Sequence, residues 1–307
     1  MIQQFDNLMQ LFRAFPDEQA AIDHLTAIRW AGGKFCPLCG NADEKRIGTL
    51  TGTNTHKCYA CRKRFSIKVG TIFQDTKLPL RTWFAAIWMI TNHPKGIAST
   101  TLAKDLGITQ KTAWFVLHRL RHAARTDSFN APLSGDVEID ETFVGGKEKN
   151  KHRSKRLNAG RGGVGKTVVM GMVERGGDVR AGVVQDTRGV TLQPIIRSHV
   201  APGSNIYSDE HGGYRGLQGA YAHHTVNHGA GEYVRDRHNH TNSIESVWAL
   251  LKRQIVGVHH WVSPKHLDRY VGEMTYRLNR REMTVGELVN DLLANSTGRL
   301  TYKALIA

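Results

Sequence analysis

Residues 135–146 read GDVEIDETFVGG, a run rich in β-branched residues that closes on two glycines. This composition predicts a β-strand, because branched side chains suit a pleated surface and glycines end it. Side chains alternate across a strand, so the run has one apolar face and one acidic face. The apolar positions are Val137, Ile139 and Phe143, and the acidic positions are Asp136, Glu138 and Asp140. The strand therefore carries three carboxylates toward one side of its sheet.

Further strands and helices follow this strand in a definite order. The expected strands are 167–174, 179–185, 204–209 and a short stretch at 223–227. The expected helices are 192–200, 242–256 and 264–281. Early strands, a helix, a further strand and closing helices resemble the order of the ribonuclease H-like fold. We therefore expect an α/β domain of that architecture over residues 131–307.

The ribonuclease H-like order implies three acids that meet in space. That fold places one acid on its first strand, one at the end of its fourth strand and one on a later helix. The matching residues here are Asp140, Asp209 and Glu245. Mg²⁺ prefers oxygen ligands, and two such ions about 3.5–4 Å apart can hold the attacking and leaving oxygens of a phosphodiester. We expect these three acids to hold two Mg²⁺ or Mn²⁺ ions.

Neighbouring acids leave alternatives open on the strands. Glu138 and Glu141 are rivals of Asp140, because both lie within two residues of it. Glu210 is a rival of Asp209. Asp209 could also serve only to begin the turn at the glycines that follow it.

The helix from residue 242 carries a basic residue near Glu245 and offers an alternative role for Glu245 itself. Lys252 lies seven residues beyond Glu245, nearly two full turns, so both side chains project from almost the same face and Lys252 can hold a phosphate. The segment NSIE at 242–245 also fits a capping box, in which Glu245 closes the helix start. Trp248 and Leu251 are expected on the face away from Glu245, in the core.

The four cysteines form two pairs, CPLC at 36–39 and CYAC at 58–61, with eighteen residues between them. Two such knuckles predict a four-thiolate zinc site, since each tight turn aims two sulfurs at one point. The expected ligands of one structural Zn²⁺ are Cys36, Cys39, Cys58 and Cys61. Residues 1–75 should form an N-terminal helix and a zinc ribbon folded around the metal. The basic finger after the second pair suits phosphate contact and comprises Arg62, Lys63 and Arg64.

Residues 97–122 contain two apolar stripes at helical spacing, interrupted by Gly107. Thr109 can cap the second helix, so the pattern predicts a helix-turn-helix within a domain over residues 76–130. A recognition helix meets base edges near its N-terminal end. The expected DNA contacts on this helix are Gln110, Lys111, Thr112 and, further along, Arg119.

The charge balance points to a polyanionic partner. The 307 residues include 42 Lys or Arg and 27 Asp or Glu, a formal net charge of +15, which favours nucleic acid. The longest apolar run is too short for a membrane span, the N-terminus has no secretory pattern, and four cysteines are too few for a disulfide scaffold. We therefore expect a cytoplasmic chain with no membrane partner.

A basic stretch at 147–161 separates the first two strands of the α/β domain. Its expected DNA contacts are Lys151, Arg153, Lys155 and Arg156. The segment GRGGVGKT at 160–167 also matches a phosphate-binding loop literally. That motif needs a strand before it and a helix after it, whereas here a basic loop precedes it and a predicted strand follows. We expect no nucleotide binding there.

Taken together, the motifs resemble the bacterial insertion-sequence transposases of the DDE class, in the subgroup with an N-terminal zinc ribbon. The resemblance covers nearly the whole chain. Its N-terminal motifs are FPDEQAAIDHLTAIRW, CPLCG, CYACRKRFS and ITQKTAWFVLHRLR. Its later motifs are VEIDETFVGG, GRGGVGKTVVMGMVERGG, YSDEHGGY, VNHGAGEYV, HTNSIESVWALLKR and the tail HLDRY…RLNRR.

The resemblance implies an enzyme that binds the terminal inverted repeats of a DNA element and catalyses strand cleavage and strand transfer with two metal ions. It implies the triad Asp140, Asp209 and Glu245, with Lys252 as a basic follower, and at least a dimer when two ends are paired. Some members have Asn as the third catalytic residue, which here would be Asn242. The competing hypothesis is a DNA-binding regulator, or an inactive remnant, that performs no catalysis.

Overall fold

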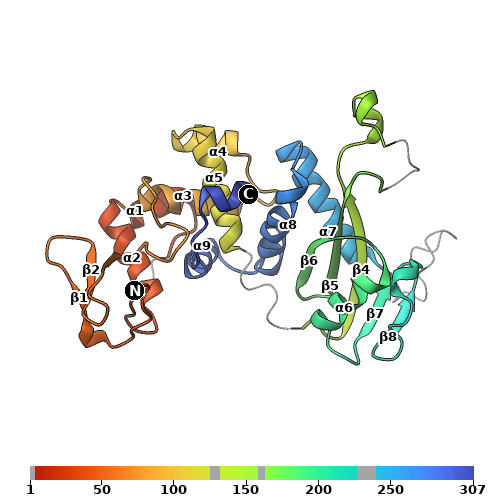
Figure 1. Ribbon diagram of the computed structural model, residues 1–307, viewed down its shortest axis with the longest axis horizontal. Helices are drawn as coiled ribbons and strands as arrows, with labels where there is room; N and C mark the ends of the chain where they lie inside the picture. The colour runs from red at the N-terminus through yellow and green to blue at the C-terminus, as the bar shows by residue number, and fades with distance from the viewer. Residues whose placement is uncertain (1–3, 125–131, 158–162, 227–239) are drawn as a thin grey trace. The chain divides into compact units, whose positions relative to one another are not determined.

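The computed structural model describes residues 4–124, 132–157, 163–226 and 240–307 (Figure 1). The chain divides into two compact units. The first, here the N-terminal unit, joins Met1–Thr126 to Glu282–Ala307. The second, here the sheet unit, is Asp127–Arg281. No helix among the described residues is both long enough and apolar enough to cross a membrane.

The sheet unit is built on one mixed sheet of five strands in the order β6-β5-β4-β7-β8 (Figure 1). The strands are β4 (Asp136–Val144), β5 (Thr167–Glu174), β6 (Val179–Val184), β7 (Asn205–Ser208) and β8 (Ala222–Thr225). β4, β5 and β6 form an antiparallel meander, whereas β7 pairs parallel with β4 and β8 pairs parallel with β7. The strand predicted from residues 135–146 is therefore the central one.

Helices cover both faces of this sheet, because alternate residues of its strands are apolar on both sides. α6 (Gly189–His199) packs on the face of Met170 and Met172, with the apolar residues of β4. α7 (Asn242–Arg253) and α8 (Pro264–Asn279) pack on the face of Val169 and Val173. α7 ends earlier than the predicted 256 and continues as a π-helical turn, η6 (Gln254–His259).

The N-terminal unit begins with α1 (Leu8–Ala14) and α2 (Glu18–Arg29), capped by the side chains of Asn7 and Asp17. A three-stranded antiparallel sheet follows, with β1 (Ile47–Thr49), β2 (Thr55–Cys58) and β3 (Arg64–Ser66). The later helices are α3 (Leu80–Asn92), α4 (Ser99–Leu106), α5 (Gln110–Ala123), α9 (Val285–Ala294) and α10 (Tyr302–Ile306).

α4 and α5 are joined by a three-residue turn. Gly107 ends α4 with a left-handed φ of +63°, a conformation that a residue without a Cβ adopts at low cost. The Thr109 hydroxyl then accepts from the backbone N–H of Thr112 and caps α5. Both helices, the break and the cap lie where the sequence predicted them.

The domain boundaries differ from the expected ones at the C-terminus. We expected a single domain over 131–307, but residues 282–307 belong to the N-terminal unit. The reason is packing: α9 lies against α3 and α2, and Ile72 donates its backbone N–H to the Ser296 carbonyl (Figure 1). The expected domains 1–75 and 76–130 also form one unit, in which Glu18 of α2 accepts the first backbone N–H groups of α3.

Candidate active site and metal centre

The four cysteines converge at the ribbon. Their sulfur atoms all lie within 4.8 Å of one another, and the Cys36–Cys61 and Cys39–Cys58 pairs are each 3.8 Å apart. Four thiolates about 2.3 Å from a tetrahedral Zn²⁺ would be about 3.8 Å apart, so the set fits the metal. Backbone N–H groups of Cys61 and Ala60 lower the pKa of Cys58 to about 7, whereas burial and the neighbouring thiols raise that of Cys39 to about 12. The predicted structural zinc ligands are therefore brought together.

The first two predicted catalytic acids lie at the centre of the sheet. Asp140 is on β4, and Asp209 follows the last residue of β7. The parallel register pairs Glu138 with Tyr207, so each acid lies two residues beyond a paired position on adjacent strands. Glu245 comes from the first turn of α7, on the sheet face toward which Asp140 points.

The carboxylates of this region affect one another's ionisation. Burial raises the pKa of Asp140 to about 6, and the carboxylates of Asp209 and Glu245 add to the rise. Burial, followed by the charges of Asp140 and Asp209, raises the pKa of Glu141 to about 7. Crowded carboxylates repel one another, and a bound divalent cation would relieve that repulsion.

The acids are more widely spaced than the thiols. Across the described ranges, the cysteines are the only group of three or more His, Cys, Asp or Glu side chains with ligand atoms within 4.8 Å of one another. Two metal ions about 3.5–4 Å apart are held by oxygen donors from more than one side. The oxygen donors fit Mg²⁺ or Mn²⁺ in kind.

Trp248 supports Asp140 in a way that the sequence did not reveal. Its side chain is buried, as predicted, but its indole N–H donates a 2.9 Å hydrogen bond to Oδ2 of Asp140. The ring lies over Gly171 of β5, where an added Cβ would be only 2.5 Å from it. The expectation that Trp248 faces away from the acidic site is therefore wrong. Its spacing of three residues from Glu245, which places both on one side of the helix, was the available signal.

Glu138 holds the start of α7. It is fully buried, and one carboxylate oxygen accepts the backbone N–H groups of Ser243 and Ile244 at 2.8 and 3.1 Å. The other oxygen accepts from Nε of Arg175 at 2.8 Å and lies 3.2 Å from Nδ1 of His240. Glu138 is thus engaged as a structural anchor, which favours Asp140 as the metal ligand of this strand.

The helix start is not closed by Glu245 in the way that the capping-box alternative requires. The side chain of Thr241, the N-cap residue, accepts no capping hydrogen bond. Glu138 accepts the backbone N–H groups of Ser243 and Ile244 instead. Glu245 accepts a 3.3 Å bond from the Thr241 hydroxyl. Asn242, the alternative third residue, is the exposed first residue of α7.

The remaining rival acids are oriented differently from Asp140 and Asp209. Glu141 points to the opposite face of β4, where its carboxylate lies 3.9 Å from Nδ1 of His211. Glu210 is exposed. Asp209 does begin a turn, since its Oδ1 accepts the backbone N–H of His211 at 3.0 Å. That turn fixes the position of one carboxylate oxygen.

Lys252 and the basic stretch lie further along the same elements. Lys252 is exposed in the last turn of α7. The stretch after β4 is folded into two short 3-10 turns, in which Lys151 pairs with Glu148 and Arg156 donates to the Lys149 carbonyl. Arg153 and Arg156 are exposed. The Lys155 side chain and residues 158–162 lie outside the described residues. Thr167 begins a strand, as expected, so the glycine-rich segment does not lead into a helix.

The expected DNA contacts of the N-terminal unit divide into exposed and buried residues. Arg62, Lys63, Arg64, Gln110 and Lys111 are exposed, and Thr112 is half-buried. Gln110 donates to the Ser99 hydroxyl, and Lys111 lies over the ring of Tyr302.

Arg119 corrects one expectation. Its side chain is only 7% exposed and donates to the backbone carbonyls of Leu300, Ile72 and Gln74. Burying a guanidinium requires several acceptors, and the three found here belong to two segments of the same unit, residues 72–74 and Leu300. Arg119 therefore joins these segments and does not face a DNA partner.

Comparisons with known proteins agree with the two parts of the chain. Residues 132–279 match the family model of the ISXO2-like transposase domain, and residues 16–64 match that of the transposase zinc-ribbon domain. An uncharacterized protein in the transposable element ISH50 of Halobacterium salinarum is 28% identical over 277 residues, which cover 86% of this chain and 91% of that protein. An uncharacterized transposase-like protein of Haemophilus influenzae is 30% identical over 102 residues, which cover 33% of this chain and 80% of that protein. No solved structure matches the chain significantly.

Proposed function

Because the chain belongs to the insertion-sequence transposases with an N-terminal zinc ribbon, we propose that it binds the terminal inverted repeats of its element and catalyses strand cleavage and strand transfer. The observation that supports the proposal is the placement of Asp140 on β4 and Asp209 directly after β7, its parallel neighbour, with Glu245 in the first turn of α7, which packs on the same sheet. The three acids are far apart in sequence, so only the fold can bring them toward one site.

The strand order supports a ribonuclease H-like architecture. Numbered from β4, the order β6-β5-β4-β7-β8 is 3-2-1-4-5, with an antiparallel meander and two parallel strands beyond it. Helices on both faces complete the α/β layers. In this arrangement the first and fourth strands are adjacent, which is why acids on them become neighbours.

Asp140, Asp209 and Glu245 would hold the Mg²⁺ or Mn²⁺ ions, which supply activation of the attacking oxygen and stabilisation of the leaving oxygen. Trp248 fixes the orientation of the Asp140 carboxylate through its indole N–H. Glu138 fixes α7, and with it Glu245, against β4. Lys252 lies about two turns beyond Glu245 on α7, where it would bind a phosphate of the DNA strand that is cut.

The N-terminal unit supplies surfaces suited to DNA. α4 and α5, with their three-residue turn, support a helix-turn-helix in which Gln110 and Lys111 lie near the start of the recognition helix. The ribbon adds exposed Arg62, Lys63 and Arg64. Since phosphate contacts release counterions, binding should weaken steeply as salt rises. Pairing of two ends requires at least two chains.

Strand cleavage and joining distinguish this enzyme from the competing DNA-binding regulator. A duplex carrying the element's end is incubated with the zinc-loaded protein and Mg²⁺ or Mn²⁺, and the products are separated on a denaturing gel. The wild type should cut and join, whereas Asp140→Asn should bind the duplex without cutting it. Equal activity of the two proteins would refute the site, and binding without cutting by both would favour the regulator.

A further inference from the structure

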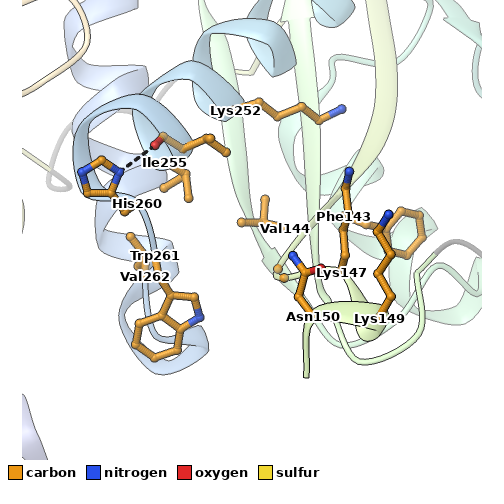
Figure 2. Close-up of a pocket in the computed structure, with 13 residues that line it drawn as sticks. Phe143, Val144, Lys147, Lys149, Asn150, Lys252, Ile255, His260, Trp261 and Val262 are labelled. Carbon is orange, nitrogen blue, oxygen red and sulfur yellow. Dashed lines mark hydrogen bonds between the residues drawn. The ribbon is translucent and has the colours of Figure 1, made fainter. Parts of the chain in front are cut away.

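A pocket of about 450 Å³ opens between the end of β4 and the segment that follows α7. Figure 2 shows Ile255, His260, Trp261 and Val262 on one side, with Phe143, Lys147 and Lys149 opposite them. Val144 lies between the two sides, and Lys252 lies above it in this view. None of the residues assigned to metal binding lines this pocket.

Two large apolar side chains of its lining are mostly exposed. The side chain of Trp261 is 66% exposed and that of Val256 is 67% exposed. Large apolar side chains that remain accessible around a hollow commonly mark a binding site. Trp261 offers a flat aromatic face of the kind on which a planar ligand can stack.

The backbone that presents Trp261 is irregular. The π-helical turn η6 precedes it, and His260 has a left-handed φ of +60°, which is costly for a residue other than glycine. Nδ1 of His260 lies 3.2 Å from the Val256 carbonyl oxygen, which ties the segment to this turn (Figure 2). π-Bulges and left-handed non-glycine residues are frequent at functional sites.

The charges around the pocket have one sign. Lys147, Lys149 and Lys252 all contribute to its lining, and the lining contains no Asp or Glu. A ligand that matches both features has an anionic part and a planar, largely apolar part. A nucleotide of a DNA strand has both, with a phosphate for the lysines and a base for the aromatic wall.

The pocket lies on the two elements that carry the acids. Val144 lies four residues beyond Asp140, about 13 Å along β4. Lys252 lies seven residues beyond Glu245, about 10 Å along α7. Since stacked nucleotides advance about 3.4 Å each, the pocket would reach a base about three or four nucleotides from the phosphate at the acids.

We propose that this pocket binds one unpaired base of the DNA strand, stacked on Trp261, with its phosphate held by Lys252 and Lys147. The proposal rests on the proposed function for the DNA substrate. A base inside a duplex is not accessible to such a pocket, so the site would select DNA that is unpaired near the cut end.

The test compares two fluorescein-labelled probes in a Ca²⁺ buffer at fixed salt. One is a blunt 30-base-pair duplex, and the other is the same duplex with three unpaired thymidines at one 3′ end. Fluorescence anisotropy with the full-length, zinc-loaded protein should show about five-fold or tighter binding of the second probe, the scale of one base–aromatic stack. Trp261→Ala should abolish the preference without changing blunt-duplex affinity, whereas Trp261→Phe should retain it.

Val190→Ala is the matched control, because Val190 is 77% exposed on α6 and is not part of the pocket. Equal binding of both probes by the wild type, or an undiminished preference in Trp261→Ala, would overturn the proposal. A third result would also overturn it: the wild type is a dimer without DNA, Trp261→Ala is a monomer, and neither protein prefers one probe. The pocket would then be assigned to contact with a second copy of the chain. Strand cleavage without the preference would refute the pocket alone, whereas the preference without cleavage would refute the proposed enzyme and leave the pocket.

Discussion

The indole N–H of Trp248 donates a 2.9 Å hydrogen bond to Oδ2 of Asp140, linking α7 to the central strand of the sheet. The bond opposes the rise in the pKa of Asp140 that burial produces. It therefore does two things at once, since it orients the carboxylate and favours its ionised, metal-binding form.

Trp248→Phe should separate this bond from the packing of the ring. Phenylalanine still covers Gly171 but has no N–H to donate, and hydrogen bonds to charged groups contribute about 1.5–3 kcal/mol. We expect strand cleavage to slow about ten-fold or more at limiting Mg²⁺ and to recover in part as Mg²⁺ is raised. Cleavage rates measured across a Mg²⁺ titration test this. A uniform loss at every Mg²⁺ concentration would indicate general damage to the fold.

Gly171→Ala tests the packing on the other side of the same ring. The new Cβ would lie 2.5 Å from Trp248, so the helix or the strand must move. Such overpacking costs about 1–3 kcal/mol of unfolding free energy. Gly182→Ala is a control on the next strand, because its Cβ would meet only Oδ1 of Asp268 at an ordinary 3.6 Å. Urea unfolding should show the loss in the first variant and little change in the second.

Glu138→Gln should damage the site without touching a metal ligand. The carboxylate is buried against Arg175 and two helix amides, and removing one partner of a buried ion pair costs about 3–5 kcal/mol. We expect a large loss of stability together with lower activity, because α7 carries Glu245. Glu210→Gln, an exposed neighbour of the site, serves as the control for charge alone. Unchanged unfolding curves for Glu138→Gln would contradict its role as an anchor.

The raised pKa values give the metal-free protein a defined pH dependence. Asp140 and Glu141 have pKa values of about 6 and 7 in the folded chain, above those of the unfolded chain. The folded state therefore binds more protons between about pH 4 and pH 7, so stability falls as pH rises through that window. Partial exposure limits the loss to about 1–2 kcal/mol for each carboxyl. Urea unfolding at pH 4.5 and 7.5 without Mg²⁺ should show the fall, which Asp140→Asn should reduce and added Mg²⁺ should offset.

Local patterns in the sequence predicted the elements of this protein well. The alternation of residues 135–146 placed β4, and Gly107 and Thr109 placed the break and the cap between α4 and α5. Spacing alone also predicted which four cysteines come together. These features depend on periodicity, turns and caps within a few residues of one another, which a single sequence records directly.

Contacts between distant segments were not predictable in the same way. Nothing near Glu138 in sequence indicates that it binds the amides of α7, and nothing near Arg119 indicates that it is buried among three carbonyls. The return of α9 to the N-terminal unit likewise depends on complementary apolar faces far apart in the chain. The pocket beside Trp261 arises from an irregular turn, which helical periodicity does not anticipate.

The most direct measurement of the proposed mechanism is strand cleavage by single substitutions of the acids, Asp140→Asn, Asp209→Asn and Glu245→Gln, beside Asn242→Ala. All four proteins are compared with the wild type on one end-containing duplex, with duplex affinity measured in parallel. Each acid variant should lose cleavage by about a thousand-fold or more while keeping its DNA affinity, since a metal ligand is lost. Asn242→Ala should remain within about ten-fold of the wild type, because no metal ligand is lost. Wild-type cleavage by any acid variant, or a loss with Asn242→Ala that matches theirs while Glu245→Gln stays active, would contradict the proposed triad.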